Sequence, residues 1–142
     1  MTSILFVVLL LVGCDTTSSE DDEPDNTPPP ATLQPTLSSI QANIFSTTCA
    51  SSRCHDSNDP EADLDLTTGN SFAELVNVAS IDLTDLLLVK PSDPDSSYLI
   101  WKIEGNPGIE GDRMPRGDNA VPLTSTQTNI IRQWISDGAL NN

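Results

Sequence analysis

Two of the chain's three cysteines and its only histidine lie in one short segment, CASSRCH at 49–55. Four residues separate Cys49 from Cys54, and His55 follows the second cysteine directly. Paired thiols can close a disulfide, and thiolates and imidazoles are common metal ligands. This segment is therefore the first candidate for a chemical site.

A covalent haem is one cofactor that would use both thiols and the histidine. Attachment of the c type needs two thiols, which add to the two vinyl groups, and a histidine beside the second thiol that reaches the iron; the common spacing is C-x-x-C-H. The spacing here is C-x4-C-H, so the loop has to bulge outward, which its small alanine and serine residues allow. Met114, in GDRMPRGD, is the only methionine after Met1 and the candidate for the second axial ligand.

Other interpretations of the segment remain open. In an oxidising compartment Cys49 and Cys54 could close a small disulfide loop, with the histidine exposed beside it. A zinc site would need a fourth ligand, for which carboxylates such as Asp56 or Asp59 are available, and this set is unusual for structural zinc. The acidic residues of 56–65 lack the order of a calcium loop, so a solvated acidic loop is favoured over a calcium site.

The N-terminus indicates the cellular compartment in which the thiols are found. The apolar run at 4–12 is too short for a transmembrane helix but has the length of a signal-peptide hydrophobic region. It ends in LVGC at 11–14, which resembles the bacterial lipobox, whose cysteine is lipidated and becomes the new N-terminus. We expect residues 1–13 to be a lipoprotein signal peptide. Cys14 would then anchor the protein to a membrane of the cell envelope, facing the periplasm or the cell exterior.

The next segment, residues 14–35, has the composition of a disordered tether. Its part at 15–35 contains six acidic residues and five prolines, and the run of three prolines favours an extended chain. Such a segment cannot bury enough apolar surface to offset the entropy lost on ordering. A spacer is therefore the favoured interpretation, and a docking segment for a basic partner is the alternative.

The remaining 107 residues, 36–142, are enough for one domain and too few for two. Because six of the 21 acidic residues lie in the tether, this domain has 15 acidic against six basic side chains. The balance excludes a nucleic acid as partner, since phosphate binding needs clustered lysines and arginines. It favours basic partners or cations instead.

Helical patterns are expected at both ends of this domain. In TLSSIQANIF at 36–45, Ser38 and Gln41 have the spacing of a capping box, and the helix runs towards Cys49. Near the C-terminus Thr124 and Gln127 have the same spacing. The apolar stripe that follows consists of Ile130, Ile131, Trp134 and Ile135, and Gly138 ends that helix.

The middle of the domain has shorter patterns. Helices are expected over 71–76 and over 93–105, the second ending at Gly105, and minor strands at 64–66 and 86–89. With only six aromatic residues in the whole chain, a core made of side chains alone would be thin. A bound cofactor would complete it, and the residues expected to line that cofactor are Ile44, Leu99 and Trp134.

Taken in order, several segments resemble one family over nearly all of residues 37–142. They are the Ile-Phe helix leading into Cys-x4-Cys-His at 44–55, LDL at 64–66, KPSDPDS at 90–96, RMP at 113–115 and WISDGA at 134–139. In this arrangement the chain is similar to the class I cytochrome c superfamily, in particular to the small cytochrome-c-like domains of planctomycete and myxobacterial type.

The resemblance implies a mostly α, small cytochrome-c-like domain with minor short strands. It implies that Cys49 and Cys54 carry the thioethers of one covalent haem c, with His55 and Met114 as axial ligands. With both faces of the iron occupied, the protein would be an electron carrier for redox partner proteins, with basic ones favoured, and not an enzyme. The alternative is a non-haem envelope lipoprotein, a binding or structural module with a Cys49–Cys54 disulfide.

Overall fold

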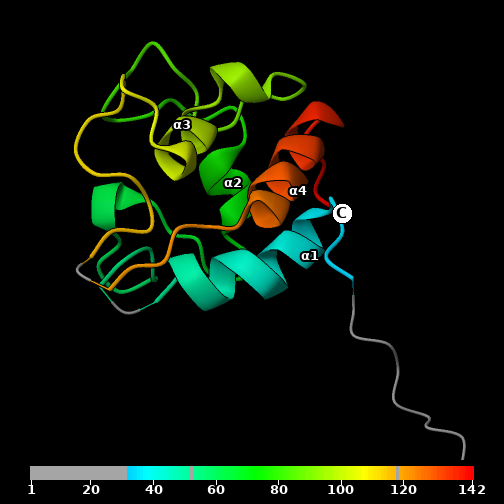
Figure 1. Ribbon diagram of the computed structural model, residues 1–142, viewed down its shortest axis with the longest axis horizontal. Helices are drawn as coiled ribbons and strands as arrows, with labels where there is room; N and C mark the ends of the chain where they lie inside the picture. The colour runs from blue at the N-terminus through cyan, green and yellow to red at the C-terminus, as the bar shows by residue number, and fades with distance from the viewer. Residues whose placement is uncertain (1–31, 52, 118) are drawn as a thin grey trace, which may run out of the picture. The chain divides into compact units, whose positions relative to one another are not determined.

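The computed structural model in Figure 1 describes residues 32–51, 53–117 and 119–142. The expected signal peptide, the lipidated Cys14 and nearly all of the tether lie outside the described residues. Within the described ranges, no helix is both long enough and apolar enough to cross a membrane. The fold is mostly helical, as expected.

The first helical segment consists of α1 (Leu37–Ile40) and the π-helix η1 (Gln41–Cys49). The expected capping box of Ser38 and Gln41 is wrong, because the side chain of Thr36 caps the helix by accepting from the backbone N–H of Ser39. The helix therefore begins two residues earlier than that box predicts, and the side chain of Gln41 is buried rather than available as a cap. The segment ends at Cys49 and so positions the first cysteine.

The last helix, α4 (Ser125–Ser136), confirms the sequence prediction at both ends. Thr124 and Gln127 form the reciprocal capping box, and Gly138 follows the helix with φ of 103°. The C-terminus then returns to α1, where the backbone N–H of Ser38 donates to the carbonyl of Asn142 over 2.8 Å (Figure 1). The two ends of the described domain are thereby joined.

The predicted helix over 93–105 is divided into two pieces, η3 (Pro94–Ser96) and α3 (Tyr98–Glu104). The break lies at Ser97, whose hydroxyl donates to the carbonyl of Asp93 and accepts from the backbone N–H of Lys90. These bonds hold Ser97 in an extended conformation that no helix contains. Gly105, with φ of 74°, ends α3 as expected.

The other helices are short, and the described residues contain no sheet. These helices are η2 (Glu61–Asp63) and α2 (Ser71–Leu75), the latter close to the predicted 71–76. The predicted strand at 86–89 forms only isolated bridges, among them Val76 with Val89. The predicted strand at 64–66 is wrong, because its backbone bonds to the loop at His55 rather than to a strand.

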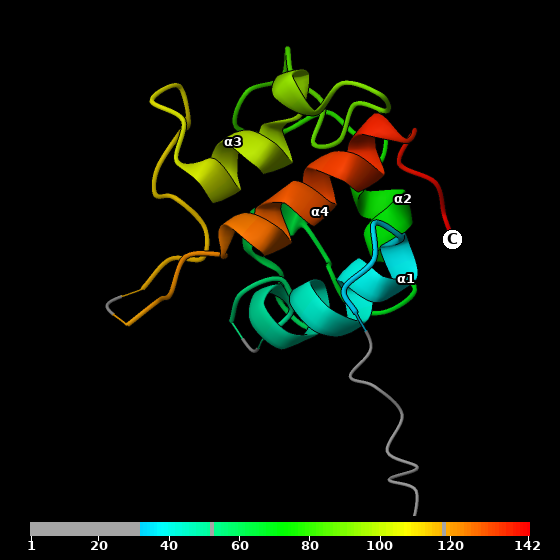
Figure 2. The same cartoon turned by 45° about the vertical axis from the view of Figure 1, so that its right-hand side comes forward.

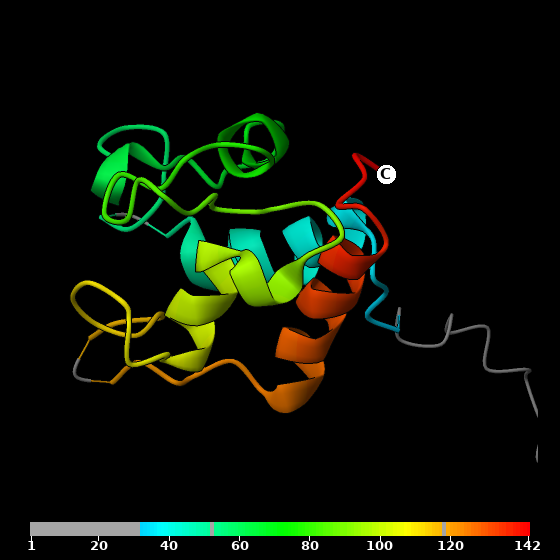
Figure 3. The same ribbon diagram turned by 90° about the horizontal axis from the view of Figure 1, so that it is seen from above.

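The core lies where α1, η1, α3 and α4 meet, and α3 and α4 run side by side (Figures 2 and 3). Ile44 and Trp134 are nearly fully buried in this side-chain core and neither lines the cavity of the candidate site, so the expectation that they line a cofactor is wrong for both. The main buried members of the core are Leu37, Ile40, Ile44, Phe45, Leu75, Val89, Ile100, Ile103, Ile131, Trp134 and Ile135.

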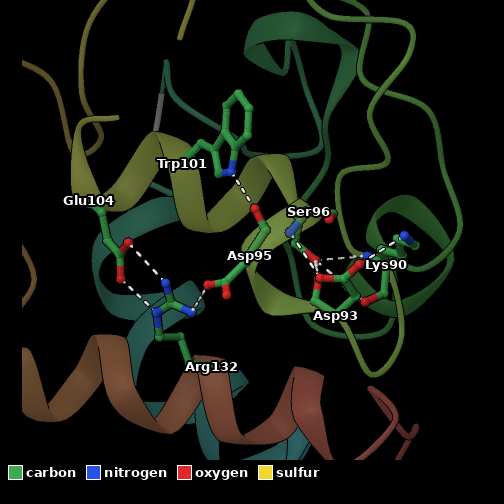
Figure 4. Close-up of polar contacts among 8 residues, drawn as sticks. Lys90, Asp93, Asp95, Ser96, Trp101, Glu104 and Arg132 are labelled. Atoms are coloured by element: carbon green, nitrogen blue, oxygen red, sulfur yellow. Dashed lines mark hydrogen bonds and ion pairs between the residues drawn. The ribbon is translucent and has the colours of Figure 1, made fainter. Parts of the chain in front are cut away.

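A polar cluster outside the core ties α3 and η3 to α4 (Figure 4). Arg132 of α4 donates from Nε to Glu104 and from Nη1 to Asp95, each over 2.8 Å. The indole N–H of Trp101 donates to the carbonyl of Asp95 in the same cluster. These bonds fix the position of α3, which forms part of the candidate site.

Candidate functional site

The four residues selected for their chemistry line one cavity of about 370 Å³. Cys49 comes from the end of η1, Cys54 and His55 from the loop that follows, and Met114 from the loop between α3 and α4. A volume of this size lies within the usual range of small-molecule sites, about 300–1,000 Å³. The structure therefore brings together residues from opposite halves of the domain.

The walls of the cavity are largely aliphatic. Leu66, Leu75 and Ile103 are buried in these walls, and Leu99, which the sequence placed beside a cofactor, lines the cavity and is partly buried. Besides two alanines and Ile81, the aliphatic lining residues are Leu64, Leu66, Leu75, Val78, Leu88, Leu99, Ile103 and Leu123. An apolar cavity with a few convergent polar groups is typical of a ligand site.

The ring of His55 is held in one orientation by the backbone. Its Nδ1 lies 3.1 Å from the carbonyl oxygen of Leu64. Because a carbonyl can only accept, Nδ1 carries the hydrogen, and the lone pair of the neutral ring lies on Nε2. Burial lowers the pKa of His55, and the bond to Leu64 and the nearby Glu61 oppose this effect only in part. The imidazole is therefore prepared to act as a neutral metal ligand.

Backbone bonds also position the two cysteines. The N–H of His55 donates to the carbonyl of Cys49 over 3.1 Å and closes the loop between the thiols. The N–H of Cys54 donates to the carbonyl of Ser51, and Arg53 adopts a left-handed φ of 69°. The loop with four intervening residues thus returns on itself and places both cysteines at the cavity.

Both thiols are free. Burial, followed by the influence of Cys54, raises the pKa of the Cys49 thiol to about 12. The protonated form of this thiol is therefore favoured in its apolar surroundings.

The zinc and calcium alternatives lack a cluster of ligands. The part of the chain that the structure describes contains no group of three or more His, Cys, Asp or Glu side chains arranged to hold a metal ion. Asp56 instead accepts hydrogen bonds from the backbone N–H groups of Asn58 and Asp59, which lower its pKa. Asp56 thus stabilises its own loop, in agreement with the solvated acidic loop expected there.

Met114 belongs to a loop that is fastened to α3. Its backbone N–H donates to the carbonyl of Lys102 over 2.8 Å, and the Nε of Arg113 donates to the carbonyl of Ile103 over 2.8 Å. The Met114 side chain is partly buried against the core. Its position in the cavity therefore depends on α3 and, through Figure 4's polar cluster, on α4.

The mouth of the cavity is acidic. We define the mouth as the lining residues that are exposed to solvent, and among them Ile81 is 60% exposed. Tyr98, just inside, donates from its hydroxyl to Asp82 and accepts from the backbone N–H of Glu110, and burial raises its pKa. The charged mouth residues are Glu61, Asp63, Asp82, Glu110, Asp112 and Arg116.

Sequence reasoning missed most of the walls and the whole mouth. Leu75 and Leu88 were recognised as apolar, but periodicity separates only buried from exposed positions and does not distinguish a core from a cavity. The acidic bias of residues 36–142 was a signal for the acidic mouth, although it did not locate the acidic side chains.

No protein-family model, curated protein or solved structure matches the chain.

Proposed function

We propose that the chain is a c-type cytochrome, a membrane-tethered carrier of electrons in the cell envelope with one covalent haem. The observation that carries the proposal is the convergence of Cys49, Cys54, His55 and Met114 on one cavity. These side chains offer two thiols, a neutral imidazole and a thioether within aliphatic walls, and this donor set fits a haem of the c type. When bound, the haem supplies a one-electron iron couple.

Each of the four residues has a distinct part in this proposal. Cys49 and Cys54 would hold the haem as thioethers, and His55 would bind the iron through Nε2, since Nδ1 is engaged by Leu64. Met114 would hold the iron as the second side-chain ligand, and a thioether in that role would favour a higher potential than a second histidine. With both His55 and Met114 holding the iron, electron transfer would be favoured over catalysis on a substrate.

The domain is mostly helical, and residues of long loops line its cavity. Both features support a cytochrome-c-like fold for this proposal. The acidic mouth supports a redox partner with a basic surface, because complementary charge speeds association between proteins. The proposed anchor, Cys14 after a signal peptide at 1–13, would place the domain in the envelope at the end of the tether.

The test is expression of the full chain together with a bacterial haem-attachment system. We expect a red protein whose haem stays with the polypeptide after denaturation and acid-acetone extraction, with a mass increase of one haem. The double variant Cys49→Ala, Cys54→Ala should lose the haem. Cys14→Ser is the matched control, because it removes the third cysteine but leaves the cavity unchanged, and it should keep the haem.

A colourless product under these conditions, with Cys49 and Cys54 joined as a disulfide, would refute the proposal. The chain would then be the non-haem envelope lipoprotein of the alternative interpretation, with the cavity as its binding site.

A further inference from the structure

One ion pair joins two walls of the cavity. The Nη2 of Arg116 lies 2.8 Å from the Oε1 of Glu61, and the two side chains are 48% and 51% exposed. Of the ion pairs in the described ranges, this is the one whose partners both line the cavity. It therefore differs from the others in linking parts of the candidate site.

Glu61 belongs to the wall that carries His55. Its backbone N–H donates to the carbonyl of Cys54 over 2.7 Å, and Cys54 precedes His55. The turn that Glu61 begins continues to Leu64, whose N–H donates back to the carbonyl of Glu61 and whose own carbonyl binds the ring of His55. The position of Glu61 is thus tied to the position of the imidazole.

Arg116 belongs to the wall that carries Met114. On the N-terminal side of this wall, Arg113 and Met114 are bonded to α3. On the C-terminal side, two residues after Met114, the side chain of Arg116 reaches Glu61 on the other wall. The methionine is therefore held from both directions, by α3 before it and by the ion pair after it.

We propose that the Glu61–Arg116 pair is a clasp that positions Met114 relative to His55. The clasp rests on the proposed function, since positioning matters only if both side chains bind one iron. Without it, Met114 stays bonded to α3 through its backbone, but its wall is no longer tied to the wall of His55. An external ligand then competes more successfully for the position that the thioether occupies.

The experiment is an imidazole titration of the oxidised haem protein. The loss of its sulfur-to-iron absorbance is the signal that reports binding. Arg116→Gln and Glu61→Gln should each bind imidazole about two- to fivefold more tightly than the wild type, the effect of losing one partly exposed ion pair. The exchange variant Glu61→Arg, Arg116→Glu should return towards the wild-type affinity. Raised salt should tighten binding in the wild type and leave both single variants nearly unchanged.

Lys90→Gln is the matched control, because it removes an ion pair of the same 2.8 Å length and similar exposure that lies away from the cavity. It should bind imidazole like the wild type. If both single variants at the clasp also match the wild type while keeping a normal haem spectrum, the clasp is wrong and the proposed function stands. A wild-type protein that takes up no covalent haem would instead overturn the proposed function.

Discussion

Met114 offers the sharpest test, because it both packs against the core and lines the cavity. Two substitutions separate the contribution of Met114 to packing from its proposed contribution as a ligand. Met114→Leu keeps nearly the same volume and removes only the sulfur, a change that costs less than about 1.5 kcal/mol in a core. Met114→Ala removes the packing as well.

The packing contribution follows from the partial burial of the side chain. A fully buried methionine replaced by alanine loses about 2–5 kcal/mol, so we expect Met114→Ala to be less stable than Met114→Leu by about 1–2 kcal/mol. For a domain of roughly 100 residues, each 1 kcal/mol of that difference lowers Tm by about 4–8 °C. The backbone bond from Met114 to Lys102 survives in both variants, so the loop stays fastened to α3.

The contribution of Met114 as a ligand is measured by absorbance spectroscopy and by the reduction potential. In both measurements Met114→Leu and Met114→Ala should behave alike. Each should keep its covalent haem, because Cys49, Cys54 and His55 are unchanged. Each should bind carbon monoxide when reduced, lose the sulfur-to-iron absorbance when oxidised, and show a lower potential than the wild type. If Met114→Leu excludes carbon monoxide and keeps the wild-type spectrum and potential, Met114 is not a ligand and the assignment of that axial position is refuted.

Three further predictions concern stability, pH and association. Arg132→Lys should lower the free energy of unfolding by about 1 kcal/mol in urea titrations, because lysine cannot bond Glu104 and Asp95 together; an unchanged midpoint would show that the cluster does not stabilise α3. The hydroxyl and the backbone N–H of Thr67 donate to Asp65, and these bonds lower the pKa of Asp65 from 3.8. The stability that the Asp65 carboxylate gives to the folded state is therefore present above pH 3.8 and is lost as the pH falls through the lower pKa of the folded state. The destabilisation caused by Asp65→Asn should therefore shrink on acidification, and a constant difference would contradict this. In the double variant Asp63→Asn, Asp112→Asn, which removes charges at the mouth, the reduced haem protein should pass its electron more slowly to the cation hexaammineruthenium(III) at low salt. The control Asp85→Asn, Asp137→Asn, which lies outside the cavity lining, should slow this transfer less; equal rates would argue against steering by the mouth.

The sequence by itself determined the features that depend on neighbouring residues. The capping box of Thr124 and Gln127 and the glycine stops at Gly105 and Gly138 were confirmed, because caps and left-handed turns are set by a few adjacent side chains. The mostly helical class followed from the same patterns. The residues of the candidate site were also selected from sequence, since thiols, imidazole and thioether are recognisable by chemistry alone.

Tertiary structure decided what depends on distant partners. Gln41, expected as a cap, is buried because Ser71 and the carbonyl of Leu66 satisfy its amide, and neither partner is visible from its local pattern. The break at Ser97 likewise depends on side-chain bonds that helical periodicity does not reveal, because its hydroxyl bonds to Lys90 and Asp93 and holds it in an extended conformation.

The cavity is the clearest case of what only the tertiary structure decided. Whether an apolar residue packs in the core, as Ile44 and Trp134 do, or faces an open space, as Leu99 does, depends on which elements meet around it. Periodicity marks a buried face of a helix but carries no information on what fills the space beyond that face. The approach of the Met114 loop to the His55 wall likewise depends on α3, α4 and an ion pair between segments that are far apart in sequence.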